Sequence, residues 1–84
     1  MNYTPTRKKE VKKILRRFFV RNLERNTTPA VVNILTELVG KFENETLYSK
    51  EESAKIQALL LEVQYGELQV EDFDNKLEEM EVEK

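Results

Sequence analysis

Charged side chains supply most of the chemistry open to this chain, because it contains no histidine and no cysteine. The chain therefore has no thiol nucleophile and no Cys/His zinc site, and it lacks the most common general base. The carboxylate run Glu71, Asp72 and Asp74 is the candidate for a divalent-cation site or an acid–base pair. It lacks the central glycine and the final glutamate of a calcium loop, whereas acidic residues suit the first turn of a helix. We therefore expect no enzymatic activity, no metal and no cofactor.

Basic residues form the most distinctive pattern in the sequence. Residues 7–25 contain nine of the fourteen lysines and arginines but only two of the sixteen acidic residues, a net charge of +7. Residues 26–84 carry a net charge of −9, which leaves −2 overall. Like charges in the basic segment recur four residues apart, and a cation near a helix N-terminus opposes the helix dipole. An anionic partner would relieve both costs.

A helix over residues 5–25 must position these cations. Thr4 is a suitable N-cap, and Pro5 at the first helical position loses no hydrogen bond. Apolar residues at helical spacing predict one buried stripe. Its members are Val11, Ile14, Leu15, Phe18, Phe19 and Leu23. At 100° per residue, five cations fall on roughly the opposite face, where we expect them to contact phosphate. They are Lys9, Lys12, Lys13, Arg16 and Arg17.

The remaining sequence predicts three more helices. A second helix over about 29–42 begins after Thr28, and we expect it to weaken or stop near Gly40. Its predicted buried stripe is Val31, Ile34, Leu35, Leu38, Val39 and Phe42. A helical hairpin over about 50–82 follows. The fold class is therefore all-α: one domain over 1–84, a bundle of about four helices with short loops.

Local signals mark the limits of the hairpin. Ser49 and Glu52 form a capping box at its start, and Gly66 can end its first helix in the left-handed conformation. The acidic tail from Glu78 onward is expected to fray. Its negative charge suits either solvent or a basic surface of a partner.

Three kinds of anion could meet the basic helix: a phosphate backbone, an acidic protein surface (including this chain's own residues 71–84) or an anionic membrane. A plain solvated face is the fourth reading. We expect contact with phosphate rather than base edges, because the face has no Asn or Gln at its centre. The residues expected to contact a partner protein are Val20, Glu71, Asp72, Asp74, Glu78 and Glu79.

The sequence thus predicts a small accessory protein of a nucleic-acid-handling complex, which binds a larger protein and touches phosphate through its first helix. The alternative is a pure protein-interaction module, such as a homodimer, an inhibitor or a subunit, in which basic and acidic helices pair between chains. No apolar run of signal-peptide length follows the N-terminal basic residues, so we expect a cytoplasmic location.

Overall fold

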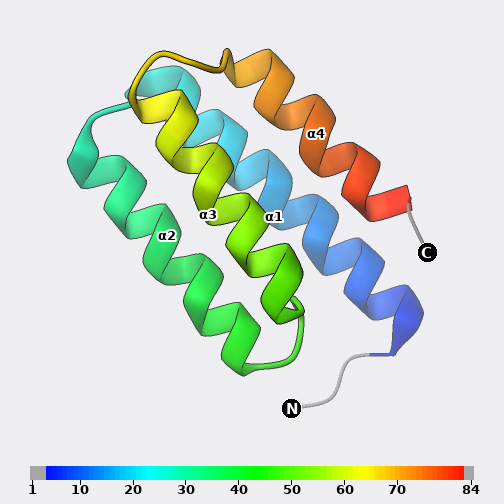
Figure 1. The fold of residues 1–84 in the computed structure, drawn as a ribbon. Helices are drawn as coiled ribbons and strands as arrows, with labels where there is room; N and C mark the ends of the chain where they lie inside the picture. The colour runs from blue at the N-terminus through cyan, green and yellow to red at the C-terminus, as the bar shows by residue number, and fades with distance from the viewer. Residues whose placement is uncertain (1–3, 83–84) are drawn as a thin grey trace.

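The computed structural model describes residues 4–82, and within that range it contains four helices and no strand (Figure 1). The helices are α1 (Pro5–Arg25), α2 (Pro29–Asn44), α3 (Lys50–Gln64) and α4 (Val70–Val82). Short loops join them in an up-down-up-down order. The predicted small all-α bundle is confirmed.

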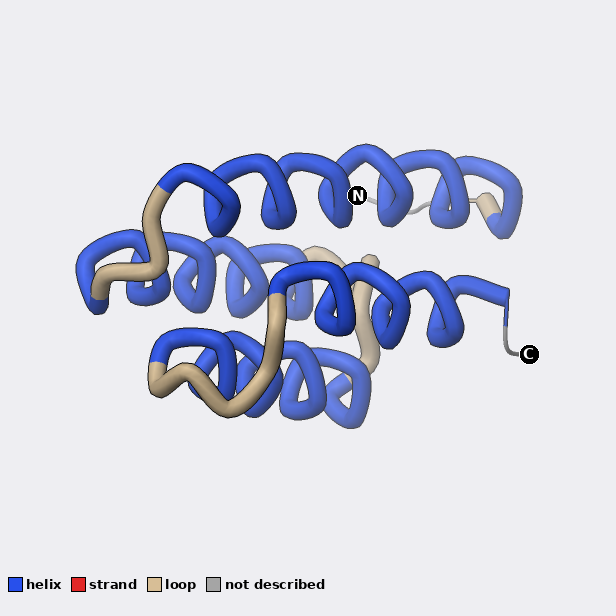
Figure 2. The backbone as a smooth tube through the Cα atoms, turned by 90° about the horizontal axis from the view of Figure 1, so that it is seen from above, coloured by secondary structure: helices blue, strands red, loops and turns tan. Residues whose placement is uncertain are grey.

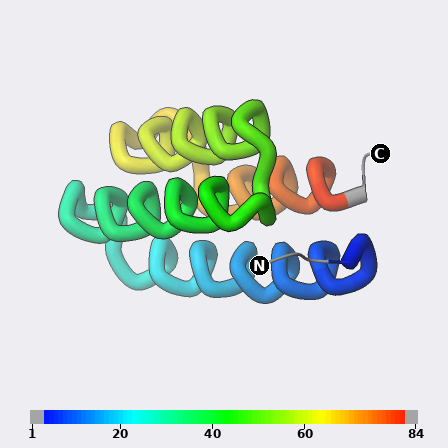
Figure 3. Tube along the Cα trace, turned by 90° about the horizontal axis from the view of Figure 1, so that it is seen from below, coloured from blue at the N-terminus to red at the C-terminus, as the bar shows by residue number. Residues whose placement is uncertain are grey.

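Each helix packs against two others. α1 and α3 lie on opposite sides of the bundle, with α2 and α4 between them (Figures 2 and 3). The closest pairs are α1 with α4 and α2 with α3, whereas α1 and α2 pack least closely of the four neighbouring pairs. The bundle measures 35 × 21 × 20 Å, so its long dimension is set by the helices.

The predicted caps start three of the helices. The Thr4 hydroxyl accepts the N–H of Arg7 at 3.1 Å, and Thr28 caps α2 in the same way. At α3 the capping box is complete: the Ser49 hydroxyl accepts the N–H of Glu52, and the Glu52 carboxylate accepts the N–H of Ser49, both at 3.0 Å. These hydrogen bonds satisfy backbone donors that a helix N-terminus otherwise leaves without a partner.

The ends of α2 and α3 share one geometry. After α3, Gly66 has φ of 78°, as predicted, and the N–H of Glu67 reaches back to the Glu62 carbonyl at 2.8 Å. α2 does not stop near Gly40 but continues to Asn44, two residues beyond the predicted end, since a helical glycine costs only about 1 kcal/mol. It closes instead through Thr46, a β-branched residue with φ of 66°.

The core is a single cluster of thirteen buried apolar residues drawn from all four helices and one loop. They are Leu15, Phe19, Leu23, Val32, Leu35, Val39, Leu47, Tyr48, Ile56, Leu60, Val63, Phe73 and Leu77. The loop contributes Leu47 and Tyr48, which lie under the turn between α2 and α3. The loop is therefore part of the hydrophobic core.

Three residues predicted to be buried are exposed. Ile14 is 65% exposed and Phe18 46% exposed on α1, and Ile34 is 61% exposed on α2. On α1 the side chain of Arg16 is buried instead. The helix is thus turned about its axis relative to the prediction, because its apolar stripe is wider than the core can cover and Arg16 finds anionic partners inside.

The predicted frayed tail begins at Glu78, but α4 continues as a helix beyond that residue. α4 is helical through Val82, and Glu81 near its end is ion-paired with Arg16. The rest of the predicted frayed segment, residues 83 and 84, lies outside the described residues.

Candidate functional site

Five exposed cations of α1 are spaced four residues apart and form an oblique row, which we call the basic row. Its members are Lys9, Lys13, Arg17, Arg21 and Arg25. At 100° per residue the row turns about 40° around the helix at each step, so Lys9 lies toward α4 and Arg25 toward α2. All five are exposed, and none has an ion pair with any of the described residues. Successive members are four residues apart, which is about 6 Å along a helix, so the row extends about 24 Å.

Lys12, predicted to belong to the phosphate-binding face, is turned toward the interior. Its ammonium group donates to both carboxylate oxygens of Glu52, at 3.0 and 3.1 Å, and it lies 5.6 Å from the centre of the Tyr48 ring. Only 18% of its side chain is exposed. The Lys12 charge is therefore already balanced within the fold.

Arg16, the second predicted residue that faces inward, joins α1 to α4. Its guanidinium donates through Nε to Glu81 at 2.7 Å and through Nη1 to Asp74. Burial alone would lower the pKa of Arg16, but the hydrogen bonds and charges of Asp74 and Glu81 outweigh it and raise that pKa. Arg16 thus stays charged and is held by two carboxylates at the α1–α4 seam.

Lys9, Lys13 and Arg17, the other three predicted phosphate-binding residues, are exposed members of the basic row. The sequence prediction omitted Arg21 and Arg25, which continue the row toward the C-terminal end of α1. The i, i+4 spacing that continues from Arg17 is the signal for them, but Lys12 and Arg16 show the same spacing although they face inward.

The residues predicted to contact a partner protein divide in a similar way. Asp74 is paired with Arg16, and Val20 is partly buried against the core. The other four, Glu71, Asp72, Glu78 and Glu79, are exposed on α4. Glu78 lines a shallow depression with Lys9 and Lys13, which places an acidic side chain beside the first half of the basic row.

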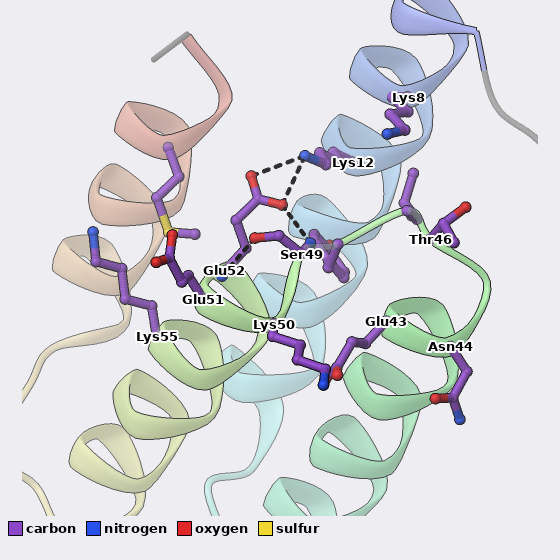
Figure 4. Close-up of a pocket in the computed structure, with 13 residues that line it drawn as sticks. Lys8, Lys12, Glu43, Asn44, Thr46, Ser49, Lys50, Glu51, Glu52 and Lys55 are labelled. Carbon is purple, nitrogen blue, oxygen red and sulfur yellow. Dashed lines mark hydrogen bonds and ion pairs between the residues drawn. The ribbon is translucent and has the colours of Figure 1, made fainter.

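An open depression of about 990 Å³ lies at the end of the bundle where α2 and α3 meet α1 (Figure 4). The Lys12–Glu52 ion pair forms part of its wall. Lysines and glutamates alternate around it, with Lys50 beside Glu43 and Lys55 beside Glu51 (Figure 4). This balance of charge gives no preference for an anion or a cation.

Within residues 4–82, no group of three or more acidic side chains converges as a metal site would require. No helix in the same range has the length and apolar character needed to cross a membrane. No known family model matches the chain, and neither a curated protein nor a solved structure is similar to it.

Proposed function

We propose that this protein is a non-enzymatic accessory protein of a nucleic-acid-handling complex and that the basic row contacts a phosphate backbone. The observation that carries the proposal is the row itself: five exposed cations, evenly spaced along one helix, with no ion pair to the described residues. Phosphate contacts of this kind give salt-dependent affinity with little sequence preference.

The separation of inner and outer cations supports this proposal. Lys12 and Arg16 are held by carboxylates of the chain itself and stabilise the packing of α1. Every member of the basic row is exposed, although the molecule carries sixteen acidic residues that could have neutralised it. A solvated row without a ligand would retain repulsion between its members, since like charges four residues apart disfavour a helix by about 0.2–0.5 kcal/mol per pair.

The alternative is a protein-interaction module with no nucleic-acid contact. Its homodimer form, in which α1 of one copy meets α4 of another, has one argument against it. α1 already packs on α4 of its own chain, where Asp74 and Glu81 occupy Arg16. The four exposed acidic residues of α4 are the surface that remains for such pairing.

The test is fluorescence anisotropy of labelled single- and double-stranded DNA and RNA at about 50 and about 200 mM salt. The informative variant replaces Lys13, Arg17 and Arg21 by glutamine. On double-stranded DNA we expect this variant to decrease the magnitude of the slope of log affinity against log salt concentration by about 2 to 3, since each phosphate contact contributes about 0.9.

The matched control replaces three exposed lysines elsewhere, Lys41, Lys50 and Lys76, by glutamine, which changes the net charge by the same amount. Equal loss of affinity in the two triple variants would mean that net charge alone drives binding and would contradict the proposal. Absence of binding by the unmodified protein at the lower salt concentration would also contradict it and favour the protein-interaction alternative. Far-UV circular dichroism checks that both variants remain helical.

A further inference from the structure

Three large apolar side chains are exposed on α1 and α2, and we call them the apolar strip: Ile14, Phe18 and Ile34. The helix geometry places Ile14 and Phe18 on the side of α1 away from α4. Arg16 follows the buried Leu15 by one residue and meets α4, whereas Ile14 precedes Leu15 and therefore projects in the opposite direction. Phe18 lies one turn after Ile14 on the same side. That side of α1 faces its other neighbour, α2.

Ile34 projects from α2 away from α3. Glu43 lies on the side of α2 that faces α3, because it lines the same depression as Lys50 of α3 and its side chain points toward Lys50 (Figure 4). Nine residues separate Ile34 from Glu43, about two and a half turns, so the two lie on opposite sides of α2. Ile34 thus faces outward along the seam with α1.

The two halves of the apolar strip lie at the same height in the bundle. Phe18 precedes the end of α1 by seven residues, and Ile34 follows the start of α2 by five. At 1.5 Å per residue, they differ by only about 3 Å in their distance from the connecting turn. The seam between α1 and α2 is also the least closely packed of the four. Apolar side chains gathered along one seam are a feature of interaction surfaces, whereas single exposed residues are not.

Arginines border the apolar strip on α1. Arg7, Arg21 and Arg25 lie within about 40° of Ile14 or Phe18 around the helix and have no ion pair with the described residues, and Glu10 is the one acidic residue of α1 within the same angle. Among the exposed charged residues of α1 and α2, seven are basic and only three, Glu10, Glu24 and Glu37, are acidic. A ligand of this surface must therefore combine apolar groups at its centre with negative charge around them.

We propose that the apolar strip and its arginines bind an amphipathic helix of another protein, with an apolar stripe bordered by acidic residues. The charges disfavour a second copy of this chain in either arrangement. Two strips placed face to face would bring like-charged arginines together. α4 of a second copy would supply acidic residues, but the described part of α4 has no exposed large apolar side chain to cover Phe18.

The experiment uses a labelled synthetic peptide of about 20 residues, with leucines at i, i+3, i+4 and i+7 and glutamates on both flanks. A second peptide has the same composition but scattered leucines. The informative variants are Phe18→Ser and Ile34→Ser. The control is Leu61→Ser on α3, because Leu61 is 47% exposed and Phe18 is 46% exposed.

We expect the striped peptide to bind the unmodified protein and the Leu61→Ser variant equally, and to bind each of the other two at least about tenfold more weakly. Equal binding of both peptides would show attraction by charge alone and overturn the proposal. So would a dimer in light scattering that Phe18→Ser dissociates, or Phe18-dependent binding to phosphatidylserine vesicles without peptide binding. The basic row shares Arg21 and Arg25 with this surface, but these variants change neither, so the two proposals fail independently.

Discussion

The ammonium group of Lys12 and the carboxylate of Glu52 meet across the diagonal of the bundle, between two helices that do not pack against each other. The Glu52 oxygen that accepts a hydrogen bond from the Lys12 ammonium group at 3.1 Å also accepts one from the backbone N–H of Ser49 at 3.0 Å. One carboxylate therefore caps α3 and ties α1 to it, so the start of α3 and the orientation of α1 depend on each other.

A double-mutant cycle with Lys12→Met and Glu52→Gln measures this tie. The side-chain amide that Glu52→Gln introduces can still accept the Ser49 N–H, so the cycle isolates the ion pair from the cap. Both native side chains are less than a third exposed, and we expect a coupling of about 0.5–1 kcal/mol in urea unfolding. Glu52→Ala should cost about 1 kcal/mol more than Glu52→Gln, because it also removes the cap. A coupling of zero would mean that the pair contributes nothing to stability.

Replacing Arg16 by methionine should destabilise the protein by about 1–3 kcal/mol, because Asp74 and Glu81 lose their shared donor. Arg17→Met should change stability by less than about 0.5 kcal/mol, since Arg17 is exposed and has no ion pair with the described residues. Arg16→Lys should restore only part of the loss, because an ammonium lacks the planar fork that reaches both carboxylates. Equal effects at the two neighbouring arginines would contradict the inward orientation of Arg16.

The neighbouring phenylalanines of α1 should respond very differently to truncation. Phe19 is fully buried, so Phe19→Ala should cost about 3–5 kcal/mol in the free energy of unfolding. Phe18→Ala should cost less than about 1 kcal/mol, because nearly half of that side chain is already exposed. Chemical denaturation of the two variants compares them directly. Equal costs at the two positions, or the reverse order, would contradict the orientation of α1 in the bundle.

Sequence spacing could identify α1 as a helix but could not choose between these two phenylalanines. The apolar residues of α1 extend around more of the helix than its contacts with the neighbouring helices can bury. Helix propensity and capping are the same for every rotation of α1 about its own axis, so they cannot select one. The choice depends on partners distant in sequence: Asp74 and Glu81 for Arg16, and Glu52 for Lys12. The caps at Thr4, Thr28 and Ser49 were predictable because each involves residues within one turn.

Thr46 offers a way to stabilise the protein. Its φ of 66° lies in the left-handed region, which costs a β-branched residue roughly 1–2 kcal/mol relative to glycine. Thr46→Gly should therefore raise the free energy of unfolding by about 1 kcal/mol, and Gly66→Ala at the equivalent end of α3 should lower it by a similar amount. Thermal melts test both changes. A destabilised Thr46→Gly variant would show that the threonine makes compensating contacts.

Tyr48 should make the fold sensitive to alkaline conditions. Burial raises the pKa of the Tyr48 phenol, and the nearby carboxylates of Glu81 and Glu52 raise it further. An unfolded tyrosine loses its proton near about pH 10, whereas the folded one retains it. The contribution to stability is therefore complete below about pH 10 and declines as the pH rises further.

Urea midpoints at about pH 9 and about pH 11 measure this decline. Tyr48→Phe should reduce it, and Tyr65→Phe, at a ring that is 69% exposed, should not. Lysines also lose charge in this range, so the comparison between the two variants is the informative quantity. An unchanged decline in Tyr48→Phe would contradict the assignment.

The position of α1 beside α4 gives the molecule a transverse electric dipole. The basic row lies on one helix, and four exposed acidic residues lie on its neighbour, α4. With a net charge of only −2, the protein as a whole is not drawn toward a polyanion. The field of a distant polyanion would instead rotate it about its long axis until α1 leads. Charge in this protein thus controls its orientation on approach more than its rate of arrival.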